Sequence, residues 1–394
     1  MNTQDPFFSL SGKSSQWNAC IGNQGNIENY VDGYMEAALE LVNAVIEQEQ
    51  YIKRDTLAMP ILYNARHALE LSLKYMHDAL CDENIIINPQ PQNHDIHSYW
   101  KLLSSTKIGD KELAQYIEDL ENYVVSLSKI DDDGQELRYA ENRDGQKSLK
   151  DKSLCNLEII RDSLLKLQKI LSNAKHRLAT FQDERKTSTF TGDCSRKDLE
   201  KISKKLPAFD KWKDNIFDQI KDEIKKEYGI GSKKFSDAVN LIKNHRTFAS
   251  SLGKEFNLIH LTDEKIKLVI NEWQKLHAPK DHNDLGMDYN ERDYEEMFEY
   301  LQKSKNVRET IAKFLSQDEA ADLEALFYIG RENLFCEFYE GKLASIKKEH
   351  KANNNLAQEI GHLIEKTNLL DCIIVGLGIL GKPSLADELS QKNA

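Results

Sequence analysis

Apolar residues along this chain recur at steps of three and four positions rather than alternating with polar ones. That period is typical of amphipathic α-helices, and only 7 prolines interrupt the 394 residues. The sequence therefore predicts an all-α protein. One expected helix begins at a cap formed by Asp55 or Thr56, and the others cover residues 27–50, 94–103, 111–128, 154–180, 198–228, 235–251, 263–276, 290–303, 318–348 and 355–374.

The segment Gln182–Arg196 interrupts this pattern, because it is rich in Ser, Thr and charged residues and has no apolar stripe. A chain of this length is typical of two domains of roughly 100 to 200 residues each. We therefore expect two helical domains, a helical bundle over residues 1–190 and a second helical domain over residues 191–394.

Charge and composition narrow the class of protein. The 53 Lys and Arg residues are outnumbered by 65 Asp and Glu residues, so the net charge is −12. Such a chain is a poor general binder of nucleic-acid phosphates, although its net charge does not exclude a local basic groove. There is no apolar run of membrane-spanning length and no signal peptide, so we expect a cytoplasmic protein without a membrane partner. The six cysteines show no zinc-type spacing, and we expect neither a metal nor another cofactor.

The tail sequence DCIIVGLGILGKPS imitates two nucleotide-binding signatures at once. Gly376, Gly378 and Gly381 spell G-x-G-x-x-G, and Gly376–Lys382 spells a P-loop without its Ser or Thr, since Pro383 occupies that position. A dinucleotide site needs further strands after the fingerprint, but only 13 residues follow Gly381. We interpret the segment as a helix C-terminus closed by glycines.

One polar group sits at the margin of an apolar helix face. Arg66, Glu70 and Lys74 follow at steps of four residues in the helix MPILYNARHALELSLKYMH, which fits a ladder of intrahelical ion pairs. Arg66 borders the buried stripe, where a guanidinium usually has a fixed partner. We therefore predict that Arg66 contacts either the His94 segment or the loop from Arg138 to Asp144.

Those two segments supply further polar side chains. In NHDIHSYW, His94 precedes a helix that Asn93 or Asp95 caps, and His94 can face back over the second helix. In ELRYAENRDG, Arg138 and Tyr139 lie in a loop that is otherwise acidic. Together with the helix that carries Arg66, these residues predict a polar cluster between helices.

The same residues resemble a group of prokaryotic HEPN-like helical proteins found in phage-defence, toxin-antitoxin and other conflict loci. The resemblance covers roughly residues 26–180. It is carried by Tyr30, Gly33, Tyr34, Ala37 and Ala38 in the first helix, by R-H-A-L-E-L from Arg66, by H-D-h-x-x-x-W from His94 to Trp100, by Arg138-Tyr139 and by Asp144-Gly145. Where family members commonly have Pro after the Arg-Tyr pair, this chain has Ala140.

The resemblance implies a helical bundle, a role in a bacterial anti-phage or toxin-type system, and a homodimer. Active HEPN ribonucleases carry Arg and His four to six residues apart on one helix, and no such pair occurs here. Arg66 and His67 are adjacent and point about 100° apart on a helix, so they cannot converge on one phosphate. The resemblance thus implies the fold and the setting but not RNA cleavage.

Three interpretations of the cluster stay open. Metal-independent RNA cleavage needs a base near neutrality and a cation at the phosphate, roles suited to His94 or His67 with Arg66 and Arg138. A second set would bind or orient the ligand: His67, Glu70, Asp95, Tyr139 and Asp144. The alternatives are a buried polar network without a ligand, and a small-ligand pocket. For the whole chain, two hypotheses of function stay open. In the first the protein binds or cleaves RNA through this cluster, and in the second it is a noncatalytic scaffold or sensor whose C-terminal half binds a partner protein.

Overall fold

Helices account for nearly all the regular structure of the chain. The computed structural model describes residues 7–10, 12–22, 25–87, 93–141, 145–149, 154–277, 294–353 and 355–391. Within these ranges the β-type pairing is limited to one isolated antiparallel bridge between Glu141 and Lys147. The all-α prediction is confirmed. The chain divides into an N-terminal unit, residues 1–185, and a C-terminal unit, residues 186–394.

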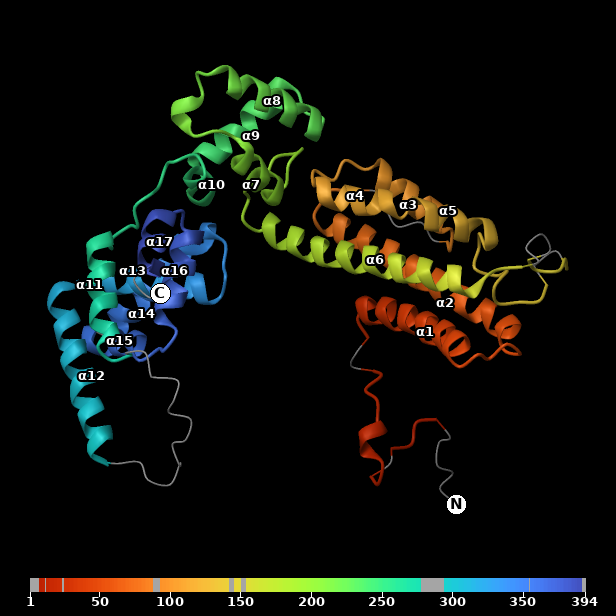
Figure 1. The fold of residues 1–394 in the computed structure, drawn as a ribbon, viewed down its shortest axis with the longest axis horizontal. Coiled ribbons are helices and arrows are strands. Elements are labelled where there is room, and N and C mark those ends of the chain that lie inside the picture. The colour runs from red at the N-terminus through yellow and green to blue at the C-terminus, as the bar shows by residue number, and fades with distance from the viewer. Residues whose placement is uncertain are drawn as a thin grey trace. The chain divides into compact units, whose positions relative to one another are not determined.

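In the N-terminal unit, three long helices pack side by side (Figure 1). They are α1 (Ile27–Glu47), α2 (Arg54–Asp82) and α6 (Leu157–Arg185), and a short 3-10 turn, η1 (Ser15–Trp17), precedes them. Three shorter helices complete the unit: α3 (Ile96–Ser105) packs against α2, α4 (Lys111–Asp119) packs against α6, and α5 (Glu121–Ile130) packs against α3 and α4. One continuous apolar core lies between these elements.

Helix α2 is central to this core, because its apolar positions recur at helical spacing and are fully buried. Ala65, Leu69 and Leu73 expose 1% or less of their surface. The helix is so enclosed that two charged residues at the edge of the stripe, Arg66 and Glu70, are buried with it. Arg66 and Glu70 must therefore find their hydrogen-bond partners within the protein.

The C-terminal unit has two apolar cores. The first is formed by α7 (Arg196–Lys205), η2 (Phe209–Lys211), α8 (Asn215–Tyr228), α9 (Ser232–Asn244) and α10 (Arg246–Ser250). The second is formed by α11 (Asp263–Gln274), α12 (Tyr294–Phe314), α13 (Gln317–Arg331), η3 (Cys336–Phe338), α14 (Tyr339–Asn353), α15 (Leu356–Ile364), α16 (Leu369–Ile379) and α17 (Pro383–Gln391).

The glycine-rich tail is helix α16 and its C-terminal cap. The amide of Gly381 donates to the Gly378 carbonyl, and the amide of Lys382 donates to the Leu377 carbonyl, which is the Schellman pattern. Gly381 has φ +73, the left-handed conformation that this cap requires. Lys382 is buried and pairs with Asp263 at 2.9 Å. The interpretation as a glycine-closed helix end is confirmed.

Glycine also lets two helices of the second core approach closely. A Cβ atom on Gly330 of α13 would lie 1.8 Å from the carbonyl oxygen of Cys372 on α16. A Cβ atom on Gly376 would lie 2.4 Å from the Leu326 carbonyl oxygen. Gly376, which belongs to both apparent nucleotide signatures, thus serves helix packing.

Several expected helices are interrupted. Residues 198–228 break at Leu206 to Asp214 around Pro207, and residues 318–348 break at Glu332 to Phe335, so the expectation of continuous helices there was wrong. Asp55 and Thr56 lie inside the first turn of α2 rather than at its cap. Among the described residues, no helix is both long enough and apolar enough to span a membrane.

Candidate functional site

Arg66 is a buried guanidinium whose hydrogen bonds stay within the protein. It is 2% exposed. Its Nε donates to the Asp131 carbonyl at 2.8 Å and its NH1 to Glu70 Oε2 at 3.0 Å, while its NH2 donates to the carbonyls of His94 at 2.6 Å and Asp132 at 3.4 Å. The prediction that Arg66 contacts the His94 segment is confirmed. With four donor contacts to protein and almost no exposure, Arg66 is not available to a phosphate in this arrangement, which gives no support to its predicted role as a catalytic cation.

Glu70 is the shared acceptor of this network. Its Oε1 accepts from Lys74 at 2.8 Å and lies 2.8 Å from His94 Nδ1, while its Oε2 faces Arg66. Burial opposes ionisation of Glu70, but hydrogen bonds from Lys74 and His94 outweigh it and lower its pKa. The buried carboxylate is therefore ionised and holds one nitrogen of the His94 ring.

His94 reaches outward from this buried partner. Its side chain is 63% exposed, and among the described residues no hydrogen bond engages its Nε2. The next residue, Asp95, caps α3 by accepting from the amides of His97 and Ser98, and it is one of the two cap residues that the sequence predicted. Burial raises the pKa of Asp95, but hydrogen bonds from the Ser98 hydroxyl and from these amides lower it below its usual value. The capped helix fixes the backbone on which His94 sits.

The acidic loop after α5 is built by its own carboxylates. Asp131 accepts from the amides of Glu136 and Leu137, and Glu136 accepts from the Leu149 amide at 3.0 Å. At Gly134 the backbone has φ +81, and a Cβ atom there would lie 3.4 Å from Arg66 NH1. The loop therefore closes over the buried guanidinium.

Arg138 and Tyr139 lie on the exposed side of this loop. The Arg138 guanidinium is 5.9 Å from the ring centre of Tyr63 and 5.1 Å from that of Tyr139, and its NH2 donates to the Tyr139 hydroxyl at 3.1 Å. His67 stacks on Tyr63 with ring centres 5.8 Å apart. Burial lowers the pKa of His67, so the ring is neutral near pH 7.

The predicted residues thus fall into two neighbouring groups along α2. Arg66, Glu70 and His94 form the buried network, and Arg138, Tyr139 and His67 gather around Tyr63. Asp144 lies outside the described residues. Tyr63 was not predicted as part of the site, although its position one helical turn before Arg66 and His67 is the signal that could have indicated it.

A second buried arginine escaped the sequence analysis. Arg177 of α6 donates to both carboxylate oxygens of Asp110 and both of Glu184, at distances from 2.6 to 3.2 Å. Burial opposes its charge, yet these carboxylates raise the pKa of Arg177. Asp110 also caps α4, so this network joins α6 to α4 and is structural.

Two side-chain groups in the C-terminal unit have metal-ligand chemistry. In the first, His245, Cys336 and Glu337 come together, but Arg196 already pairs with both oxygens of Glu337, at 2.9 and 3.2 Å. Burial raises the pKa of the Cys336 thiol to about 11, which keeps it protonated. This group is a polar network in which the charge of Arg196 compensates that of Glu337. The second consists of Glu324, His350 and Glu359.

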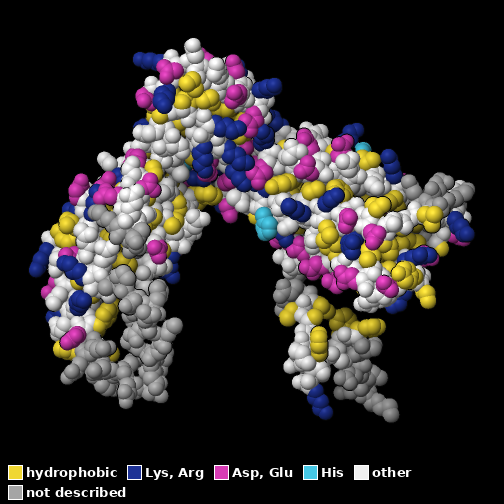
Figure 2. Space-filling view, in the orientation of Figure 1, with side chains coloured by type: hydrophobic (Ala, Val, Ile, Leu, Met, Phe, Trp, Pro, Cys, Tyr) yellow, Lys and Arg dark blue, Asp and Glu magenta, His cyan; other side chains and the backbone are white. Residues whose placement is uncertain are grey.

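The exposed surface carries no field of a single sign on the face in view. Basic and acidic side chains are interspersed over the N-terminal unit, with apolar side chains exposed between them (Figure 2). Comparison of the chain with protein-family models, with curated proteins and with solved structures found no match.

Proposed function

We propose that the N-terminal unit binds single-stranded RNA through its His94–Arg138 surface, which comprises Tyr63, His67, His94, Arg138 and Tyr139. The observation that carries the proposal is the guanidinium of Arg138, which is exposed and held against two tyrosine rings. Unpaired bases stack on such aromatic and guanidinium planes, and an exposed guanidinium pairs with phosphate oxygens.

His94 adds a directed polar group to this surface. With Nδ1–H donating to the ionised Glu70, its Nε2 faces outward, where it can form a hydrogen bond with a ligand. Tyr63 and Glu70 are two turns apart on α2, so the Arg138 and His94 ends of the surface lie roughly 10 Å apart along the helix. That separation suits a short stretch of unpaired nucleotides.

The charge balance of the chain favours a small contact. The net charge of −12 argues against tracking a long backbone. Asp131 and Glu136 are engaged as acceptors for loop amides, so they belong to the scaffold that presents Arg138. We therefore expect weak salt dependence, corresponding to one or two phosphate contacts.

The resemblance to HEPN-like proteins supports a setting in a bacterial anti-phage or toxin-type system, with a homodimer as the expected assembly. The lack of the Arg/His catalytic spacing and the enclosure of Arg66 favour RNA binding over RNA cleavage. In this proposal Arg66 and Glu70 position the surface, and His94, Arg138 and Tyr139 contact the RNA.

A second candidate function is a noncatalytic scaffold or sensor that binds a partner protein. It is favoured by the segment before α1, in which Phe7, Phe8, Leu10, Trp17 and Ile21 are all exposed. Large apolar side chains gathered in one exposed segment are typical of protein interaction sites. The two functions predict different sensitive residues.

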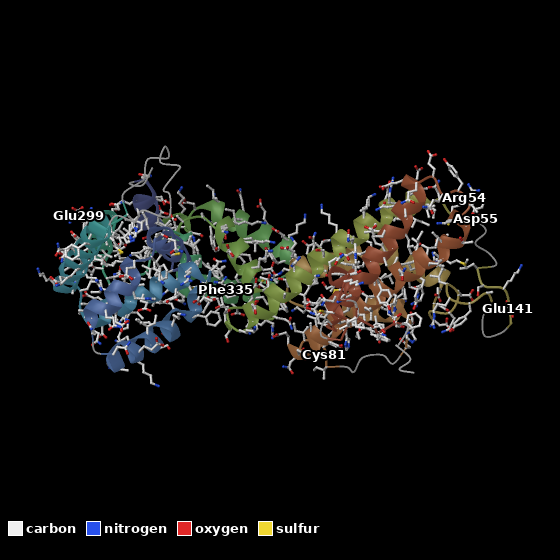
Figure 3. All side chains as sticks on the ribbon, turned by 90° about the horizontal axis from the view of Figure 1, so that it is seen from below. Arg54, Asp55, Cys81, Glu141, Glu299 and Phe335 are labelled. Atoms are coloured by element: carbon white, nitrogen blue, oxygen red, sulfur yellow. The ribbon has the colours of Figure 1, made fainter. Side chains whose placement is uncertain are left out.

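The test is fluorescence anisotropy of the full chain with labelled single-stranded RNA. Tyr139→Ala should weaken binding roughly 5- to 150-fold, the range that corresponds to one lost stacked base. Arg138→Ala should weaken binding and reduce the slope of log K against log salt by about 0.7, as expected for one phosphate contact on a single strand. Arg54→Ala is the matched control, since Arg54 at the start of α2 is 60% exposed, pairs with its neighbour Asp55 and is not part of the proposed surface (Figure 3).

Equal affinities of the Arg138→Ala and Arg54→Ala proteins for RNA would refute the proposed surface. If the scaffold function holds instead, Trp17→Ala should impair capture of the partner while RNA binding is absent in the unaltered protein. Cleavage is tested on the same RNA in chelator, and we expect intact RNA with both the unaltered protein and the His94→Ala protein.

A further inference from the structure

The second group of metal-ligand side chains in the C-terminal unit brings together three helices. Glu324 comes from α13, His350 from α14 and Glu359 from α15, and their nearest ligand atoms all lie within 4.8 Å of one another. His350 Nε2 is 2.7 Å from Glu324 Oε2 and 3.6 Å from Glu359 Oε2. One nitrogen and two carboxylate oxygens thus converge on one point.

This group lacks the charge balance that the protein provides elsewhere. Among the described residues, no lysine or arginine pairs with Glu324 or Glu359. Two carboxylates with one imidazolium carry a net charge of −1, and with a neutral imidazole they carry −2. Glu324 is buried and the Glu359 side chain is 14% exposed, and carboxylates enclosed to this degree need a compensating charge. A divalent cation bound by a neutral imidazole and two carboxylates would bring the net charge to zero.

The imidazole itself is incompletely satisfied by the protein. His350 is 1% exposed, and its Nδ1 has no hydrogen-bond partner in the part of the chain that the structure describes. The nitrogen that faces the two carboxylates is Nε2, on the other side of the ring. Nε2 is therefore the atom that would bind an ion, and Nδ1 would carry the ring proton.

The donor set indicates the class of ion. An imidazole with two carboxylates suits zinc and similar transition metals, whereas magnesium prefers an all-oxygen shell. Metal–ligand bonds of about 2.0 to 2.2 Å place neighbouring ligand atoms of a tetrahedral site roughly 3.3 to 3.6 Å apart. The present spacings of 2.7 and 3.6 Å are within a small side-chain shift of that geometry.

A neighbouring amide already orients one ligand. Asn353 Nδ2 donates to Glu359 Oε1 at 2.8 Å, which leaves Glu359 Oε2 directed to His350. Such hydrogen bonds to ligating carboxylates are typical of metal sites. The other group, His245 with Cys336 and Glu337, differs because Arg196 supplies its positive charge, so it serves as an internal control.

We propose that Glu324, His350 and Glu359 bind one divalent transition-metal ion of the zinc class, which joins α13, α14 and α15. The bound ion would contribute to the stability of the C-terminal unit, because it binds the folded state and no comparable arrangement exists in the unfolded chain. Three protein ligands leave at least one coordination position for water.

The test is a cobalt titration of the full chain after removal of metals with a chelator. We expect one equivalent of Co²⁺ to bind with visible d–d absorption, Zn²⁺ to displace it, and Mg²⁺ to leave it bound. Zn²⁺ at 100 times its Kd should raise the Tm of the C-terminal unit by roughly 5 to 10 °C. His350→Ala and Glu359→Gln should each weaken Co²⁺ binding at least 10-fold.

Glu359→Gln keeps the proposal testable if His350→Ala fails to fold, because the glutamine carbonyl can still accept from Asn353. His245→Ala is the matched control and should bind Co²⁺ as the unaltered protein does. The proposal is overturned if no saturable binding occurs, or if Glu359→Gln leaves the Kd for Co²⁺ unchanged. It is also overturned if a sulfur-to-cobalt charge-transfer band places the ion at Cys336.

Discussion

Replacing Arg66 with alanine removes a buried cation that joins α2, the start of α3 and the loop after α5. Glu70 keeps Lys74 and His94 as partners, but the carbonyls of Asp131, Asp132 and His94 lose their donor. Removing one member of a buried ion pair costs about 3–5 kcal/mol, and each unpaired buried group costs roughly 1–3 kcal/mol. Because Glu70 stays partly compensated, we expect a loss of about 3–5 kcal/mol.

The loss should appear in the N-terminal unit alone. For a unit of 185 residues it corresponds to a fall in Tm of roughly 6 to 20 °C. Urea unfolding followed by pulsed hydrogen exchange and mass spectrometry reports peptides of residues 1–185 separately from the rest. Arg138→Ala is the control, since an exposed guanidinium on two rings contributes less than about 1 kcal/mol. Equal stability of the two variants would show that Arg66 is not the anchor we describe.

Two further predictions concern the C-terminal unit. Gly330→Ala should destabilise it by about 1–3 kcal/mol or more, because its Cβ would meet the Cys372 carbonyl oxygen; Gly341→Ala, at an open helical position, should be neutral or stabilising in the same urea titration. Although burial opposes it, the Glu324 hydrogen bond and the charges of Glu324 and Glu359 raise the pKa of His350. Protonated His350 should therefore add to the free energy of unfolding of the C-terminal unit, measured in chelator, below the usual histidine pKa. This contribution should decline as pH rises through the raised pKa. A His350→Gln protein that keeps this decline would contradict the assignment.

The sequence was informative where a local rule decides the structure. Helical periodicity was enough to predict α1, α2 and α6, and the position of Arg66 beside an apolar stripe was enough to predict that it needs an acceptor. The particular acceptors could not be predicted, because they are backbone carbonyls whose position depends on how the loop at Gly134 closes. Pro207 should have signalled the break before α8, but the continuous charge pattern obscured it.

Contacts between residues that are distant along the chain could not be predicted from local sequence patterns. Glu324 and His350 are 26 positions apart, and His245 and Cys336 are 91 positions apart. A search for ligands at fixed short spacing does not find such sets, since only the packing of separate helices brings them together. Arg177 was missed for a related reason: its partner Asp110 lies 67 residues away.

The enclosure of Arg66 by the loop after α5 has a consequence for whatever binds above it. The loop is tied down by two hydrogen bonds from the Arg66 guanidinium, to the carbonyls of Asp131 and Asp132, and by the two backbone amides that donate to the Asp131 carboxylate. The loop therefore loses its conformational entropy when the bundle folds, and it does not need to lose it again when a ligand binds. The RNA that we propose for Arg138 and Tyr139 would therefore meet a preorganised backbone. A substitution at Arg66 would then weaken RNA binding without touching the RNA, because the loop would have to be ordered when the RNA binds.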